Sequence, residues 1–396
     1  MARFDPFPAV RYAADRVELA RVAVPPYDVI GDDERAALAA RHDRSAVRID
    51  LPVEEGGVDR YQVAHDLLAA WLEDGTLVRD EEPTFTVHRM SYVDDAGRER
   101  HTTGVVGALE LTEPGTDILP HEHTTPKART DRLDLLRSCR ANLSSIWGLS
   151  LARGLTELLP TAEPPLARFA DDGGVTHTVW RIEDPEALAR ISAAVAGAPV
   201  VIADGHHRYE TSLAYKAERT AAEGDPGPAT AAMTYVVERV EDELEVRAVH
   251  RRLTGQPAGS DRGEALEPWC EPLGPAPAGG EVTAALVAQG ALAVVQPGGE
   301  VLVRPRPEAL AGTRDLDSSR LDVALAALDG VTVTYQHGVD HVRAAVASGA
   351  ADAGVLLRPA TVAQIEATAH GGERMPPKTT FFHPKPKTGL VFRLLD

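Results

Sequence analysis

One short junction constrains the fold of this chain more than any other stretch of its sequence. The apolar run Ala198-Pro-Val-Val-Ile-Ala203 is long enough for a buried strand, and it ends at Asp204-Gly205. The segment that follows, 206–219, carries apolar residues at helical spacing. Because a buried strand that leads directly into a helix is typical of mixed α/β proteins, we expect an α/β fold with mixed sheets.

The residues at this junction suit an anion. The first turn of a helix presents backbone N–H groups and a positive dipole end, and Gly205 lets a ligand approach the backbone. His206, His207 and Arg208 add donors there, although cations at this end oppose the helix dipole unless an anion lies above them. Asp204 either caps the helix or holds Mg²⁺ beside the phosphates. A plain glycine turn with a capping aspartate and surface histidines remains the alternative.

A second polar segment, residues 121–127, begins directly after Pro120 and includes Pro126. In an extended chain His121 and His123 face one side and Glu122 faces the other, with Thr124 next to them. Glu122 is then a candidate general base, and Lys127 is a candidate phosphate contact. The alternative is a polar loop that precedes a helix.

The end of the chain is locally basic. No acid stands between Glu373 and Asp396, whereas Lys378, Lys385 and Lys387 all do. In a chain with a formal net charge of -19, such a stretch is suited to closing over an anionic ligand. We expect Lys378 to contact phosphate, while an edge strand protected by lysines and prolines is the alternative.

Composition limits the remaining classes. The two cysteines are too few for a disulfide framework, and the start of the chain lacks the apolar core of a signal peptide. No run approaches the roughly 20 apolar residues of a membrane span. We therefore expect a cytoplasmic protein with no membrane contact, and the acidic charge disfavours nucleic acid. The sequence leaves a homodimer open.

Proline and glycine divide the chain into three regions. Residues 1–254 form the N-terminal and central catalytic region, and residues 255–280 are rich in these two residue types. We interpret 255–280 as a linker or excursion. Residues 281–396 form a C-terminal α/β region that ends in the basic tail.

Four motifs in order resemble a large bacterial family known as domain of unknown function 1015. They are Val24-Pro-Pro-Tyr-Asp28, His121-Glu-His-Thr124, Ala203-Asp-Gly-His-His-Arg-Tyr-Glu210 and Met375-Pro-Pro-Lys-Thr-Thr-Phe-Phe382. The third motif also resembles the phosphate motif of the ParB/sulfiredoxin-like fold, in which free L-serine kinases use Asp-Gly-His-x-Arg to hold nucleotide phosphates and a glutamate as base. This resemblance implies a ParB/sulfiredoxin-like core lobe with N- and C-terminal elaborations.

The same resemblance implies phosphoryl transfer from ATP or ADP, with Mg²⁺, to a small hydroxyl compound such as free L-serine. Glu122, Asp204 and His206 are the expected catalytic residues, and Asp204 is the expected metal ligand. The remaining site residues divide into two groups. Those expected to bind phosphate or nucleotide are Gly205, His206, His207, Arg208, Lys127 and Lys378, and those expected to bind substrate are His121, His123, Thr124 and Glu210.

Two other functions stay open at this point. The four histidines with Glu122 and Asp204 could serve a metal-dependent hydrolase, although adjacent histidines on a helix project about 100° apart and cannot easily bind one ion. A ParB-like regulator that binds nucleotide or DNA is the alternative that is not an enzyme. The sequence shows no basic recognition helix, which counts against DNA binding.

Overall fold

A computed structural model describes residues 1–94, 97–122, 126–240, 243–255, 265–277 and 279–396, with the backbone alone for 126–129. The chain forms two compact units. Unit 1 comprises Met1–Leu244, Ala369–Gly372 and Pro384–Asp396, and unit 2 comprises Glu245–Thr368 and Glu373–His383. The chain therefore leaves unit 1 twice, and it returns with Ala369–Gly372 and again with its last residues.

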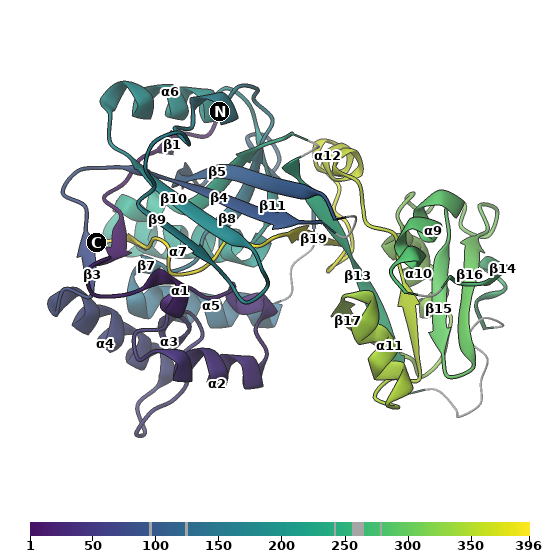
Figure 1. The fold of residues 1–396 in the computed structure, drawn as a ribbon. Helices are drawn as coiled ribbons and strands as arrows, with labels where there is room; N and C mark the ends of the chain where they lie inside the picture. The colour runs from purple at the N-terminus through teal and green to yellow at the C-terminus, as the bar shows by residue number, and fades with distance from the viewer. Residues whose placement is uncertain (95–96, 123–125, 241–242, 256–264, 278) are drawn as a thin grey trace. The chain divides into compact units, whose positions relative to one another are not determined.

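Unit 1 is built on a mixed sheet in the order β6-β11-β8-β12-β5-β4-β10-β9, and β1 pairs with β5 (Figure 1). The pairs β6/β11 and β8/β12 are parallel and the others are antiparallel. The strands are β1 (Phe4–Asp5), β4 (Phe85–Val93), β5 (Glu99–Glu110), β6 (Ile118–Pro120), β8 (Ile146–Ser150), β9 (Ala167–Ala170), β10 (Thr176–Ile182), β11 (Val200–Asp204) and β12 (Ala231–Glu238). Two small sheets pair β2 (Val10–Tyr12) with β3 (Leu77–Arg79) and β7 (Ala141–Asn142) with β20 (Arg393–Leu394).

Helices pack against this sheet, and further helices come before it in the N-terminal part of the chain. They are α1 (Leu19–Val22), η1 (Tyr27–Val29), α2 (Asp32–Arg41), α3 (Val47–Asp50), α4 (Arg60–Glu73), α5 (Pro126–Cys139), η2 (Thr156–Leu158), α6 (Pro185–Ala196), α7 (His206–Glu223) and η3 (Gly227–Thr230). Asp59 caps α4 and Asp184 caps α6, each by accepting a backbone N–H in the first turn.

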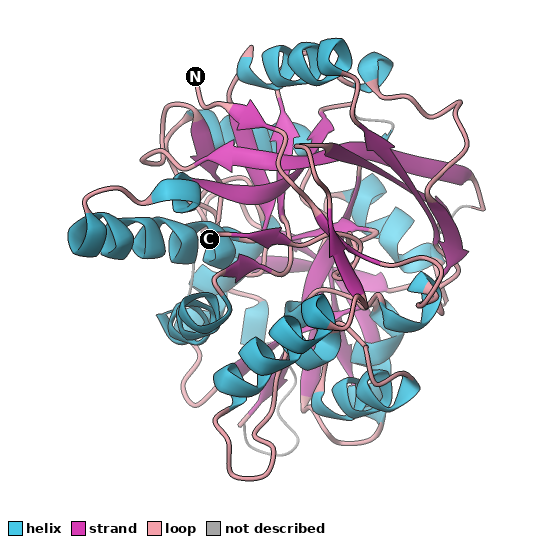
Figure 2. Cartoon of the chain, turned by 90° about the vertical axis from the view of Figure 1, so that its left-hand side faces the viewer, coloured by secondary structure: helices cyan, strands magenta, loops and turns pink. Residues whose placement is uncertain are grey.

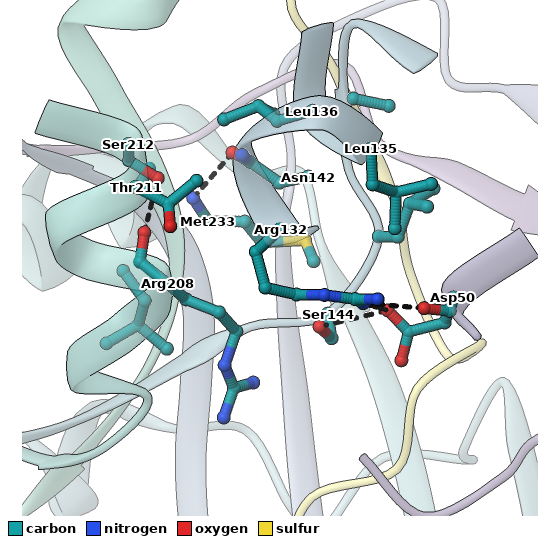
Figure 3. A pocket seen from close by; sticks show the side chains of 14 residues that line it. Asp50, Arg132, Leu135, Leu136, Asn142, Ser144, Arg208, Thr211, Ser212 and Met233 are labelled. Atoms are coloured by element: carbon teal, nitrogen blue, oxygen red, sulfur yellow. Dashed lines mark hydrogen bonds and ion pairs between the residues drawn. The ribbon is translucent and has the colours of Figure 1, made fainter. Parts of the chain in front are cut away.

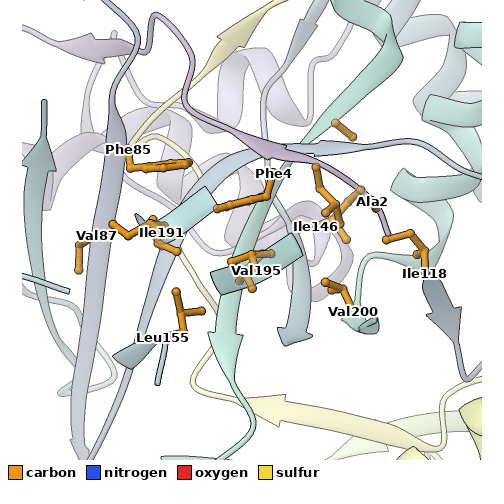
Figure 4. Close-up of a cluster of buried hydrophobic side chains, with 14 of the residues drawn as sticks. Ala2, Phe4, Phe85, Val87, Ile118, Ile146, Leu155, Ile191, Val195 and Val200 are labelled. Carbon is orange, nitrogen blue, oxygen red and sulfur yellow. The ribbon is translucent and has the colours of Figure 1, made fainter. Parts of the chain in front are cut away.

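The core of unit 1 fills the face of the sheet under α6. Phe4 and Phe85 stack with their ring centroids 5.1 Å apart, and Ile191 and Val195 of α6 pack into the same cluster (Figure 4). Tyr209 contributes to this cluster from α7. Burial of this apolar surface fixes where the two helices lie against the strands.

A second core joins the N-terminal helices to the end of the chain. Trp71 of α4, Leu135 of α5 and Phe392 are buried in one cluster. Val10 forms a bridge with Phe392, and Val24 forms one with Thr388. The last residues of the chain are therefore a structural part of unit 1.

Unit 2 contains an antiparallel sheet in the order β14-β16-β15-β18-β13-β17, and β19 pairs with β13. Its elements are β13 (Glu245–Thr254), β14 (Cys270–Pro275), α9 (Glu281–Gln289), β15 (Leu292–Gln296), β16 (Gly299–Pro305), α10 (Asp317–Ala326), β17 (Thr332–His337), α11 (Val339–Ala347), β18 (Ala353–Leu356), α12 (Val362–His370) and β19 (Thr380–His383). Helices α9 and α11 share one apolar cluster with the sheet, and α10 belongs to another.

The expected mixed α/β class is confirmed, with 33% helix and 31% strand, and the sheet of unit 1 contains both parallel and antiparallel pairs (Figure 2). The two units divide the chain differently from the expected regions, since β13 belongs to unit 2 and residues 369–372 and 384–396 belong to unit 1. Part of the expected linker, 255–280, forms β14, and residues 256–264 and 278 lie outside the described residues. The ParB/sulfiredoxin-like core lobe stays a prediction. In the described part of the chain, no helix is both long and apolar enough to cross a membrane.

Candidate functional site

Strand topology brings the two histidine-containing motifs to one edge of the sheet. Strands β6 and β11 are parallel, and Pro120 pairs with Ile202. His121-Glu122 therefore leaves the sheet beside Ala203-Asp204. The carboxyl ends of neighbouring parallel strands are a common place for ligand sites in α/β proteins.

The turn from β11 into α7 depends on a bulge and a glycine. The register between β11 and β8 shifts between Ile202 and Asp204, as it does at a β-bulge. Gly205 then adopts φ 88° and ψ 28°, a left-handed conformation that favours glycine. A Cβ atom on Gly205 would lie 2.9 Å from Nε of Arg208. Glycine is thus required at position 205 for two reasons: the left-handed backbone conformation and the close approach of the Arg208 side chain.

His121 and His206 form a buried pair. Through His121 this pair links the end of β6 to β11 and to the start of α7. The Nδ1 atom of His121 lies 2.7 Å from the carbonyl oxygen of Ile202, so this nitrogen donates. The backbone N–H of His121 donates to Nε2 of His206 at 3.3 Å. His121 is 0% exposed and His206 is 8% exposed. The expected substrate contact by His121 does not fit this burial, and His206 uses one ring nitrogen to accept from the backbone.

Four charged side chains, which we call the Asp204 cluster, meet where α7 begins: Asp28, Asp204, Arg208 and Lys385. Nη2 of Arg208 donates to Oδ2 of Asp204 at 2.7 Å. Nζ of Lys385 pairs with Oδ1 of Asp204 and, at 3.2 Å, with Oδ2 of Asp28. Burial alone would lower the pKa of Lys385, but the two carboxylates raise it above its ordinary value. Lys385 is therefore a protonated, buried ammonium group.

Arg208 is only partly satisfied in this arrangement. Its Nη1 donates to the carbonyl oxygen of Ser145, and its Nη2 is held by Asp204. Nε is buried and has no hydrogen-bond partner among the residues that the structure describes. A buried donor of this kind costs free energy unless a water molecule or a ligand accepts from it. The guanidinium carbon also lies 5.9 Å from the centroid of the Tyr27 ring.

A second group of polar residues lies behind Arg208, around a cavity of about 50 Å³ (Figure 3). Arg132 lies 4.1 Å from the Tyr27 ring centroid and donates to the backbone oxygen of Asp50 at 2.6 Å. Asp50 is 1% exposed, and burial raises the pKa of its carboxyl group. Ser144 and Thr388 both donate to Asp50. The cavity has room for a few water molecules.

The other expected site residues are distributed as follows. Glu122 and Glu210 are partly buried in unit 1, Glu122 directly after His121 and Glu210 in α7. Lys378 belongs to unit 2, where its carbonyl oxygen accepts from Arg251 at 3.2 Å. His123 and Thr124 lie outside the described residues, as does the side chain of Lys127. His207 is partly buried in the first turn of α7.

Asp204 does not fit the expected role of a ready Mg²⁺ ligand. Both of its carboxylate oxygens are paired with cations, one with Arg208 and the other with Lys385. A metal ion would have to displace one of these side chains. Within the described residues, no group of three or more histidine, cysteine, aspartate or glutamate side chains could hold a metal ion.

Sequence reasoning did not identify Tyr27, Asp28 or Asp50 as parts of the site. One signal was present, because Tyr27 and Asp28 belong to the motif Val24-Pro-Pro-Tyr-Asp28. Lys385 was noted only as one of several tail lysines. Two residues of this motif therefore lie beside Lys385 and Arg208.

Comparison with protein families gives one match. The family described as "Protein of unknown function (DUF1015)" matches residues 4–317, which is most of the chain. No curated protein matches this chain.

Several solved structures show a low likeness to this chain. A free serine kinase variant in complex with ADP is 13% identical, with a TM-score of 0.38 over 69% of this chain and 90% of that chain. A free serine kinase in complex with AMP is 14% identical, with a TM-score of 0.37 over 69% and 89%. SbnI with a C-terminal truncation, from Staphylococcus aureus, is 11% identical, with a TM-score of 0.39 over 72% and 85%. At these TM-scores the likeness assigns neither a fold nor an activity to this chain.

Proposed function

The chain belongs to the DUF1015 family of proteins of unknown function, and we propose that it is a nucleotide-dependent phosphotransferase that acts on a small hydroxyl compound. The most plausible acceptor is free L-serine, which would give O-phosphoserine, with ATP or ADP as donor. One observation carries the proposal: Arg208 has a buried, unpartnered Nε at the start of α7, within the described residues.

The surroundings of Arg208 support a phosphate ligand there. Helix α7 has 18 residues, and its first turn contains no acidic residue. Its N-terminus follows Gly205 at the carboxyl end of β11, where backbone N–H groups and the helix dipole favour negative charge. His207 and Arg208 add positive or donor groups at the same place, and Lys127 adds another in this proposal. Phosphoryl transfer needs little covalent help from a protein beyond such positioning and charge stabilisation.

Glu122 is the proposed general base. It follows His121, which the hydrogen bond to Ile202 fixes beside β11. It would accept the proton of the substrate hydroxyl group as the new bond to phosphorus forms. Mg²⁺ would be bound by the nucleotide phosphates, which carry its usual ligands, and Asp204 would hold Arg208 and Lys385 in place.

The experiment combines binding and chemistry. Purified protein is screened by thermal shift with ATP, ADP, AMP and GTP, with Mg²⁺ present, and is then incubated with the best nucleotide and a pool of free amino acids. Mass spectrometry should find one amino acid heavier by a phosphoryl group. The proposal is wrong if no nucleotide raises the melting temperature and no phosphorylated compound forms. Stoichiometric zinc or iron in the pure protein would favour the hydrolase instead.

A further inference from the structure

The C-terminal segment delivers one lysine to the beginning of α7. Lys385 is 8% exposed at its side chain, and its ammonium group lies between the carboxylates of Asp28 and Asp204. These two partners precede it in the sequence by 357 and 181 residues. The two carboxylates offset the desolvation of this ammonium group, and a buried ion pair is by itself weak evidence of a contribution to stability.

The neighbouring residues hold this lysine in place. Thr388 donates to Asp50 at 3.2 Å. Thr388 also bridges to Val24 through the backbone, and Phe392 is fully buried further along. The backbone around Lys385 is therefore pre-organised, whereas the four-carbon stem lets the ammonium group shift by a small distance.

The charges of the Asp204 cluster show what this lysine adds. Among the four side chains of this cluster, the carboxylates of Asp28 and Asp204 would outnumber the guanidinium of Arg208 if Lys385 were absent. With Lys385 the cluster is balanced, and two cations flank Asp204. A metal ion bound to Asp204 would have supplied the same charge, but both oxygens of Asp204 are already paired.

From this geometry we infer that Lys385 is a phosphate-contacting residue of the proposed site, and that it provides at Asp204 the positive charge for which a metal ion would otherwise be needed. This inference rests on the proposed function. The ammonium group remains beside Asp28 and turns toward the phosphate oxygens of the nucleotide, next to Arg208. A charged donor of this kind binds phosphate as a point charge.

The test compares ADP with adenosine, both without Mg²⁺ and in the presence of EDTA, by calorimetric titration of the whole chain. Lys385→Met should weaken ADP binding by roughly tenfold or more and leave adenosine binding within about twofold. Lys385→Arg, which keeps the charge, should recover part of the loss. Lys387→Met is the matched control, because Lys387 comes from the same segment and is similarly buried, and it should change neither affinity.

Each result decides the matter. Equal ADP affinity in Lys385→Met and the wild type, or an equal loss for ADP and adenosine, overturns the phosphate contact while the proposed function stands. A wild-type protein that binds neither compound overturns both. Should Lys385→Met fail to fold, Lys385→Gln combined with Asp28→Asn removes one charge of each sign, and the same two titrations apply to it.

Discussion

Two lysines of one short segment each pair with a carboxylate, and yet their surroundings differ. Lys385 belongs to the Asp204 cluster at the start of α7. Lys387 belongs to what we call the His177 cluster: His88, Asp171, His177 and Lys387. In the second cluster Nε2 of His177 donates to Asp171 at 3.2 Å, and its Nδ1 accepts from Nε2 of His88 at 3.0 Å.

The difference lies in what each cluster faces. His177 is 0% exposed and His88 is 1% exposed, and their rings stack on each other, with Phe169 stacked on His177. Hydrogen bonds and rings thus fill the space around these imidazoles. Arg208 in the Asp204 cluster instead keeps a buried donor without a partner in the described part of the chain. The same type of ion pair therefore serves packing in one place and, in our proposal, a ligand in the other.

The largest expected effect is a pH dependence of the free energy of unfolding, which comes from the His177 cluster and not from the Asp204 cluster. Burial lowers the pKa of both His88 and His177, so both stay neutral in the folded protein where they would be protonated in the unfolded chain. As pH falls below about 6.5, the unfolded state binds more protons, and the free energy of unfolding should drop by up to about 2.7 kcal/mol per pH unit. Burial would raise the pKa of Asp171, but hydrogen bonds from His177 and Lys387 lower it, so this carboxylate stays charged over the same pH range. Urea unfolding at pH 7, 6 and 5 measures the slope.

The control for this prediction is a double variant, His88→Gln with His177→Gln. It should unfold with a visibly shallower pH dependence than the wild type, because two groups that titrate only in the unfolded state are gone. Identical slopes in the two proteins would contradict the assignment of neutral, buried imidazoles.

The next effect concerns chemistry at the Asp204 end alone. Glu122→Gln keeps the shape of the side chain and removes the proton acceptor, so turnover should fall by at least about tenfold, and general-base help is typically about 10²–10⁴-fold. Nucleotide affinity should change little. Glu210→Gln is the comparison variant, since Glu210 is the next candidate base. Wild-type turnover in Glu122→Gln would move the base elsewhere.

A smaller effect tests the guanidinium of Arg208. Arg208→Lys should weaken nucleotide binding by about 1–3 kcal/mol, because lysine cannot make a bidentate contact with phosphate oxygens. Calorimetric titration gives this number directly. Arg219→Lys is a matched control on the same helix, where Arg219 pairs with Glu223 at 2.6 Å, and it should bind nucleotide as the wild type does. Unchanged affinity in Arg208→Lys would remove Arg208 from the site.

Local sequence signals predicted the elements that carry the site. Apolar spacing indicated a helix over 206–219, and the structure has α7 from His206 to Glu223. The apolar run that ends at Ala203 likewise forms most of β11. These elements could be predicted because the spacing of apolar residues and the residues that end a helix or strand are local features of the sequence.

The rest of the site depends on pairings between distant segments. Nothing local distinguishes Lys385 from Lys378 in a tail rich in proline, and only the topology brings Lys385 to Asp204. His121 was expected to bind substrate, and its full burial could not be predicted, because the carbonyl group of Ile202 that accepts from its Nδ1 comes from another strand. Asp50 shows no pattern in the sequence, since its partners Ser144 and Thr388 come from other parts of the chain.

The smallest expected effect uses the two glycines that flank α7. Gly205 and Gly224 have φ angles of 88° and 79°, so alanine should cost about 1–2 kcal/mol of stability at either end through backbone strain. Only at Gly205 would the new Cβ meet a side chain, since Nε of Arg208 would lie 2.9 Å away and the guanidinium is held by Asp204 and Ser145. Gly205→Ala should therefore also weaken nucleotide binding by about 1 kcal/mol, or roughly fivefold, whereas Gly224→Ala should leave it unchanged. Thermal unfolding and titration of both variants measure the two effects separately. If Gly205→Ala binds nucleotide as well as Gly224→Ala does, the position of Arg208 does not determine the affinity, and the contrast between the two lysine clusters loses its main support.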